Sequence, residues 1–103
     1  IPDREGWAEP VMWMFNLHLS GSPSLSRDEI MEALKAEGIE TREAFVPINK
    51  QKVLLEEGSV SENDCPEANY IMDNGFYLPS GLNLKKPDID FIAEKLINLN
   101  KKL

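Results

Sequence analysis

The sequence predicts an α/β (α+β) two-layer sandwich, in which helices cover one face of a small three-stranded sheet. With 103 residues, of which 42% are hydrophobic, the chain has the size and apolar content of one folded domain. One segment shows the two-residue alternation of a strand, and three others carry apolar residues at helical spacing. Because strands and helices follow one another along residues 1–103, we expect a single domain with two layers.

The first strand is expected after residues 1–10, a polar lead-in segment with prolines towards both ends. Apolar side chains then occupy every second position: Val11, Trp13, Phe15, Leu17 and Leu19. The opposite face holds Met12, Met14, Asn16 and His18. This alternation predicts a strand with one buried face, and the two methionines make the other face a possible interface.

The first helix is expected directly after Ser26, because Ser26 and Glu29 have the spacing of a capping box. Ile30, Ala33 and Leu34 follow at helical spacing, and Gly38 offers a left-handed end to the helix.

Residues 39–46 are then expected to form the second strand, which Pro47 ends. Residues 47–63 are mostly polar and are expected to form a long irregular loop. Loops of that length are uncommon in a small domain unless they are functional or mobile.

A second helix is expected from Asp64, with Glu67 in its first turn and Asn74-Gly75 at its end. It would carry Cys65, Ala68, Ile71 and Met72. Residues 76–78 predict a short third strand, followed by a turn. Pro87 is expected to open the last helix, because its missing N–H costs nothing there. That helix would present one apolar stripe, formed by Ile89, Ile92, Leu96, Leu99 and Leu103.

Charge and composition exclude several classes of function. Eighteen acidic residues against eleven basic ones give a net charge of −7, so the basic surface that nucleic-acid binding needs is missing. The longest apolar run, Val11 to Phe15, is too short for a membrane helix. Cys65 is the single cysteine, which rules out an internal disulfide and favours a reducing, cytoplasmic setting. The chain starts at Ile1 without a methionine, and we expect it to be a piece of a longer protein.

The residues alone indicate no self-contained catalytic site, and none is assigned. His18 is the only histidine, so no zinc site can be built with it, and a partly buried or interface histidine is the favoured interpretation. Cys65 is best interpreted as a small buried helix residue instead of a nucleophile. Lys50 and Lys52 lie in the long loop, where either could meet a phosphate.

Several motifs nevertheless resemble those of one family. Gly38-Ile39-Glu40-Thr41-Arg42 with Phe45-Val46-Pro47 resembles the "GIETR…P" segment of the DegT/DnrJ/StrS sugar aminotransferases. Cys65-Pro66-Glu67-Ala68 and Gly75-Phe76-Tyr77-Leu78-Pro79-Ser80 are similar to the "CP.A…G.YLPS" stretch of that family. Residues 11–15 resemble the strand before these motifs, and the last helix fits the family's "ID.I…L" ending. The motifs occur in the family's order and spacing across nearly the whole chain.

The resemblance implies a C-terminal small domain of a fold-type I aminotransferase that depends on pyridoxal phosphate. In such enzymes a large N-terminal domain holds the cofactor and the Schiff-base lysine, so we expect this piece to bind no cofactor and not to catalyse alone. The implied parent is a homodimer that transfers an amino group from glutamate to a keto-sugar nucleotide, in polysaccharide, surface-sugar or antibiotic-sugar biosynthesis. The small domain would close the active-site cleft and shape the sugar pocket.

The resemblance also implies substrate-binding residues, namely Arg42, Asn49 and Lys50. Family members often carry a histidine shortly after the proline, where this chain has Asn49, an amide that can hydrogen-bond a sugar hydroxyl but cannot titrate. Thr41 and Arg42 could instead pair with carboxylates beside the strand. Tyr77, Pro79 and Ser80 are better interpreted as turn and packing residues than as substrate contacts.

A second interpretation belongs to a different class: a stand-alone acidic α/β module whose exposed sheet face binds a protein. A coding sequence with a pyridoxal-binding lysine upstream of Ile1 would favour the aminotransferase, and a start codon near Ile1 would favour the module.

Overall fold

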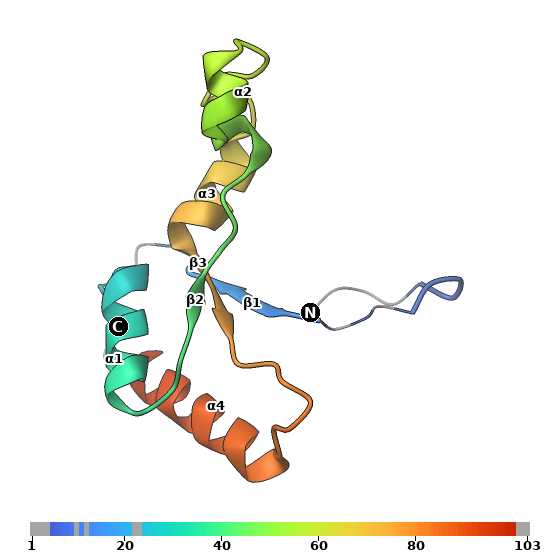
Figure 1. Cartoon of the computed structure of the whole chain (residues 1–103). Helices are drawn as coiled ribbons and strands as arrows, with labels where there is room; N and C mark the ends of the chain where they lie inside the picture. Colours follow the sequence, from blue (N-terminus) through green and yellow to red (C-terminus); the bar gives the residue numbers. More distant parts are fainter. Residues whose placement is uncertain (1–4, 10, 12, 22–23, 101–103) are drawn as a thin grey trace.

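The computed structural model describes residues 5–9, 11, 13–21 and 24–100, and it has the expected α+β architecture (Figure 1). The elements are, in order, β1 (Phe15–His18), α1 (Arg27–Ala36), β2 (Arg42–Glu43), the 3-10 turn η1 (Ile48–Lys50), α2 (Lys52–Glu56), α3 (Pro66–Asn74), β3 (Gly75–Leu78) and α4 (Lys86–Asn100). Helices α1 and α4 lie together beside the sheet, whereas α3 and α2 extend away from its other end (Figure 1).

The three strands form an antiparallel sheet in the order β1-β3-β2, so the last strand in sequence lies in the centre. Phe76 pairs with Leu17 on one side and Glu43 on the other. Tyr77 pairs in the same way with Asn16 and Arg42. Directly opposed residues share a face, and neighbours along a strand alternate. The sheet therefore has a Phe76 face and a Tyr77 face.

The Phe76 face carries the core. Phe76 is only 1% exposed, and the buried cluster around it comprises Ile30, Leu34, Ile39 and Ile92. These residues come from α1, the segment after it and α4, so α1 and α4 are the helices that cover this face. A 2.7 Å ion pair between Lys95 and Glu37 ties α4 to the end of α1.

The capping box predicted at the first helix is confirmed. The Ser26 hydroxyl accepts a hydrogen bond from the Glu29 N–H, and the Glu29 carboxylate accepts one at 2.7 Å from the Ser26 N–H. These bonds satisfy backbone donors that the first turn of a helix leaves unpaired. Gly38 has a φ of +79°, the left-handed conformation that ends the segment as predicted.

The strands are shorter than predicted. β1 contains four residues instead of extending from Val11 to Leu19, and β2 contains two instead of eight. Val11, Trp13 and Phe15 are 89%, 71% and 49% exposed, so the predicted buried face is wrong as far as Phe15. Met12 lies outside the described residues. The length of the central strand limits the pairing of β1 and β2. β3 begins where α3 ends, and Pro79 has no N–H to extend the ladder.

The junction between α3 and β3 has no loop at all, and Gly75 makes that possible. A Cβ on Gly75 would collide with the carbonyl oxygen of Ile71, and it would lie 3.2 Å from the Cβ of Ala44. Only glycine therefore allows the last turn of α3 to pass directly into the central strand.

Residues 47–63 are not the irregular loop that was predicted, because they contain η1 and α2. The side-chain amide of Gln51 donates to the carbonyl of Val46, and the N–H groups of Leu54 and Leu55 donate to the carbonyl of Gln51. These local bonds organise a polar stretch that has little apolar periodicity.

The second helix begins at Pro66 instead of Asp64, which accepts a hydrogen bond from the Ser61 N–H in the preceding turn. Cys65 is exposed and stands just before the helix, so the prediction of a buried helix residue is wrong.

The last helix carries most of the predicted stripe. Ile92 is buried and Leu96 and Leu99 pack against the core, whereas Ile89 is 54% exposed. Leu103 lies outside the described residues. Within the described part of the chain, no helix has the length and apolarity needed to cross a membrane.

Candidate substrate-binding face

The Tyr77 face of the sheet carries the clearest candidate site. A depression of about 330 Å³ opens beside Arg42 and Tyr77, which lie opposite each other on β2 and β3. Its lining comprises Trp13, Met14, Glu40, Arg42, Tyr77, Leu78, Pro79 and Ser80. The site therefore combines one guanidinium, one carboxylate and two aromatic rings.

Arg42 is exposed, and it takes part in none of the ion pairs found among the described residues. The alternative prediction, pairing with a carboxylate beside the strand, is therefore not observed. Its neighbour Glu43 belongs to the other face and lies 4.0 Å from the guanidinium of Arg27. An unpaired guanidinium offers planar donors that match a carboxylate or a phosphate.

Contacts around the depression hold the Tyr77 ring and the backbone at Trp13. The Tyr77 ring packs against the Phe45 ring with centroids 5.3 Å apart. The Ser80 hydroxyl donates a 2.9 Å hydrogen bond to the carbonyl of Trp13 and so ties the segment before β1 to the turn after β3. A sugar ring or a base can lie against such aromatic faces while its polar groups meet Arg42 and Glu40.

Asn49 lies elsewhere, against α3, and is only 2% exposed. Its Nδ2 donates to the carbonyl of Glu62 at 2.8 Å and to Oδ1 of Asn69 at 2.9 Å. Asn69 in turn donates from its Nδ2 to the same carbonyl at 2.6 Å. The Oδ1 of Asn49 is buried and has no hydrogen-bond partner among the described residues. The side chain thus joins three segments of the chain.

Lys50 also faces α3, where its ammonium lies 4.0 Å from the carboxylate of Asp73. The three predicted substrate-binding residues are consequently found in two places. Arg42 lies in the sheet beside Tyr77, and Asn49 and Lys50 lie on η1 against α3.

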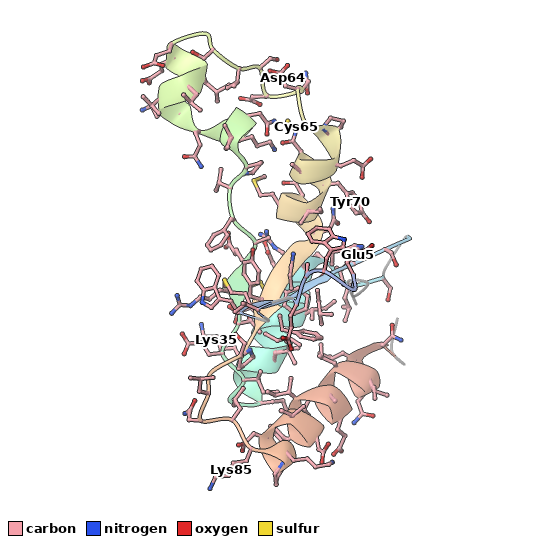
Figure 2. All side chains as sticks on the ribbon, turned by 90° about the vertical axis from the view of Figure 1, so that its right-hand side faces the viewer. Glu5, Lys35, Asp64, Cys65, Tyr70 and Lys85 are labelled. Atoms are coloured by element: carbon pink, nitrogen blue, oxygen red, sulfur yellow. The ribbon has the colours of Figure 1, made fainter. Side chains whose placement is uncertain are left out.

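The two other reactive side chains considered from the sequence do not join this site. Cys65 stands just before the first turn of α3, at the opposite end of the molecule from Lys85 (Figure 2), and it does not line the depression. The His18 ring meets Tyr70 edge-on at 6.4 Å between ring centroids. The described residues contain no cluster of His, Cys, Asp or Glu that could hold a metal ion.

Pyridoxal phosphate forms its Schiff base with an enclosed lysine amine. Lys35, Lys52 and Lys86 are largely exposed. Lys50 and Lys95 are partly buried and lie near acidic side chains. The surroundings of these lysines do not fit an enclosed Schiff base.

Comparison with known proteins identifies the family. A sequence model of the DegT/DnrJ/EryC1/StrS aminotransferase family matches residues 2–97. The chain belongs to this family. The motif resemblance found in the sequence is therefore confirmed. GDP-perosamine synthase from Caulobacter vibrioides is 29% identical over 86 residues, which cover 84% of this chain and 22% of that protein.

Two solved structures have a similar fold. Both are of Spr1654 from Streptococcus pneumoniae, which is assigned as a sugar aminotransferase. The PMP form matches with a TM-score of 0.72 at 19% identity, and the apo form with 0.71 at 20%. Each match covers 86% of this chain and 22% of the other, so the chain spans less than a quarter of the length of these relatives. The predicted fold class is confirmed by this similarity.

Sequence reasoning missed the aromatic part of the candidate site. The alternation predicts Trp13 on a buried strand face, whereas it is 71% exposed and lines the depression beside Arg42. Tyr77 packs against Phe45 as predicted, and it also lines the depression. One signal was available for Tyr77, because it alternates with the apolar Phe76 and Leu78 in β3 and must face the other way. No comparable signal existed for Trp13, whose position depends on where β1 begins.

Proposed function

We propose that this chain is the C-terminal domain of a pyridoxal-phosphate-dependent aminotransferase that acts on keto-sugar nucleotides, where it closes the active-site cleft and shapes the sugar pocket. Family membership and the sugar-related names of its relatives support this proposal. The cofactor and its lysine would be held by the part of the protein outside these residues, and the cofactor would supply the electron sink for amino transfer.

One observation supports the substrate-facing role above all: Arg42 is exposed, has no ion-pair partner among the described residues, and lies beside Tyr77 on the face that α1 and α4 leave open. On a chain with a net charge of −7, this guanidinium would provide a local anion site. The nucleotide sugar carries phosphates, which a guanidinium binds with two parallel donors. Trp13 and Tyr77 would lie against its rings, and Glu40 could accept hydrogen bonds from sugar hydroxyls.

The proposal also includes Asn49 and Lys50, which lie on η1 and not on the sheet beside Arg42. Asn49 would fix η1, and with it the approach of residues 47–56 to the substrate, because both of its donors are used by Glu62 and Asn69. Lys50 is only 4.0 Å from Asp73 but keeps part of its side chain exposed, so its ammonium could turn towards a phosphate.

The remaining parts of the proposal follow the family. Glutamate would be the amino donor, the parent enzyme would be a homodimer, and the reaction would take place in the cytoplasm. The product would be an amino sugar for polysaccharide or surface-sugar biosynthesis.

The test is amino transfer by the natural full-length protein, supplied with pyridoxal phosphate, glutamate and a panel of keto-sugar nucleotides. We expect an amino-sugar nucleotide and 2-oxoglutarate in equal amounts. A full-length protein that holds the cofactor but converts none of the panel would contradict the proposed substrate class. A natural protein with no cofactor-binding domain would instead favour the stand-alone interaction module.

A further inference from the structure

The depression on the Tyr77 face places one carboxylate beside its one guanidinium. Glu40 and Arg42 both line it, whereas Thr41, which stands between them in the sequence, does not. This is the pattern of an extended segment, in which alternate side chains lie on the same side. None of the other described residues that line the depression carries a charged group. A ligand bound there would therefore meet one positive and one negative side chain.

The Glu40 carboxylate is not neutralised by a neighbour. Glu40 is exposed, and it takes part in none of the ion pairs found in the described part of the chain. Lys35 lines a second depression together with Glu40, but its ammonium lies 3.7 Å from the carboxylate of Glu32. Arg42 does not pair with Glu40 either. Both charged groups of the depression are thus free to meet a ligand.

The two groups match different parts of a nucleotide sugar. A guanidinium has only donors and an ionised carboxylate only acceptors. Phosphates are therefore attracted to Arg42 and repelled by Glu40, whereas sugar hydroxyls can donate to Glu40. A sugar that carries its own carboxylate would place a second negative, acceptor-only group beside Glu40. With Arg42 bound to phosphate, no second cation among the described lining residues could compensate it.

We propose that Glu40 determines specificity for the sugar: its carboxylate favours the nucleotide of a neutral keto-sugar and disfavours that of a sugar acid. This role rests on the proposed function, because it requires that the phosphates of a nucleotide sugar bind Arg42. Repulsion between like charges across a binding site rejects wrong ligands more effectively than it strengthens correct ones. Glu40 is thus a specificity-determining residue and takes no part in moving the amino group.

The test compares two inhibitors of the natural full-length protein during amino transfer from glutamate to the keto-sugar nucleotide that it accepts. Both inhibitors carry the nucleoside diphosphate of that substrate, one attached to glucose and the other to glucuronate. The pair differs only by a hydroxymethyl group against a carboxylate. Inhibition constants are measured for the unchanged protein, Glu40→Gln and Glu40→Asp. Glu94→Gln is the matched control, because Glu94 is an exposed glutamate on α4 that does not line the depression.

In the unchanged protein we expect the glucuronate nucleotide to bind about tenfold or more weakly than the glucose nucleotide. Glu40→Gln should reduce this ratio to about threefold or less, chiefly through tighter binding of the glucuronate nucleotide. Glu40→Asp and Glu94→Gln should retain the ratio, because the first keeps the charge and the second removes one elsewhere.

Two results would overturn the role of Glu40 and leave the proposed function intact: equal binding of both inhibitors to the unchanged protein, or the same ratio in Glu40→Gln as in the unchanged protein. A full-length protein that aminates no keto-sugar nucleotide would overturn both the role of Glu40 and the proposed function.

Discussion

The side-chain amides of Asn49 and Asn69 form a 2.9 Å hydrogen bond, and both donate to the carbonyl oxygen of Glu62. Twenty residues separate the two asparagines, so this pair connects η1, the turn before α3 and α3 itself. Asn49 is almost completely buried, which makes each of its bonds costly to lose. The segment from Val46 to Cys65 is thus held in place by polar contacts more than by an apolar core.

We predict that Asn49→Ala lowers the free energy of unfolding by about 1–3 kcal/mol, because it removes two buried hydrogen bonds. Asn69→Ala should cost less when Asn49 is already alanine, since the two amides share one acceptor. Urea unfolding of the two single variants and the double variant measures this coupling. Asn98→Ala, at an exposed position, is the control and should stay within about 0.5 kcal/mol of the unchanged protein. Strictly additive effects would show that the pair does not act together.

Gly75 should be the least replaceable glycine of the described chain. A Cβ there would meet the Ile71 carbonyl and the Ala44 side chain, so Gly75→Ala must push α3 away from β3. We expect a loss of about 1–3 kcal/mol or more in the free energy of unfolding, as for other overpacked sites. Gly6→Ala is a matched control, because nothing lies within 4 Å of a Cβ at that position. Similar stability of the two variants would contradict the direct junction between α3 and β3.

The capping box predicts a pH dependence of stability. Hydrogen bonds from the backbone and the side chain of Ser26 hold the pKa of Glu29 below its ordinary value. The stabilising effect is therefore fully present above the pKa of the unfolded chain, about 4.3 for a glutamate, and is lost as the pH falls through the lower folded pKa. We expect Glu29→Gln to be less stable than the unchanged protein at pH 7, and the difference to shrink below about pH 4. Unfolding curves across that range measure it.

Ser26→Ala provides the check on the cause, because it removes the hydroxyl and leaves the carboxylate in place. In that variant the advantage of Glu29 over Gln at pH 7 should be smaller. A difference between Glu29 and Gln that stays the same from pH 7 to pH 3 would rule out the carboxylate as the source of the pH dependence.

The parts of the fold that local chemistry determines could be predicted from the sequence. The helix that starts at Ser26 and the stop at Gly38 depend on neighbouring residues, and both are observed. The lengths of the strands could not be predicted, because they depend on how far the central strand runs between Gly75 and Pro79. Val11 and Trp13 alternate correctly but have no partner strand at that point.

Only part of the candidate site could be predicted, because the site combines residues from segments that are distant in the sequence. Arg42 is predicted because its motif resembles a family segment, but its neighbours Tyr77, on β3, and Trp13, before β1, come from segments distant in the sequence. Asn49 was predicted to meet substrate from its place after Pro47. Its bond to Asn69 depends on the packing of η1 against α3, for which the sequence carries no local signal.

The most direct test of the central claim, that the Tyr77 face binds the nucleotide sugar, is the KM of the full-length protein with Arg42→Gln. We expect the KM for the keto-sugar nucleotide to rise about tenfold or more, since a hydrogen-bonded charge contributes about 1.5–3 kcal/mol. The KM for glutamate should change less than about twofold by the same reasoning. Lys35→Gln, which removes an exposed charge on α1, is the control and should leave both constants unchanged. An unchanged KM for the nucleotide sugar in Arg42→Gln would contradict the assignment of this face to the substrate.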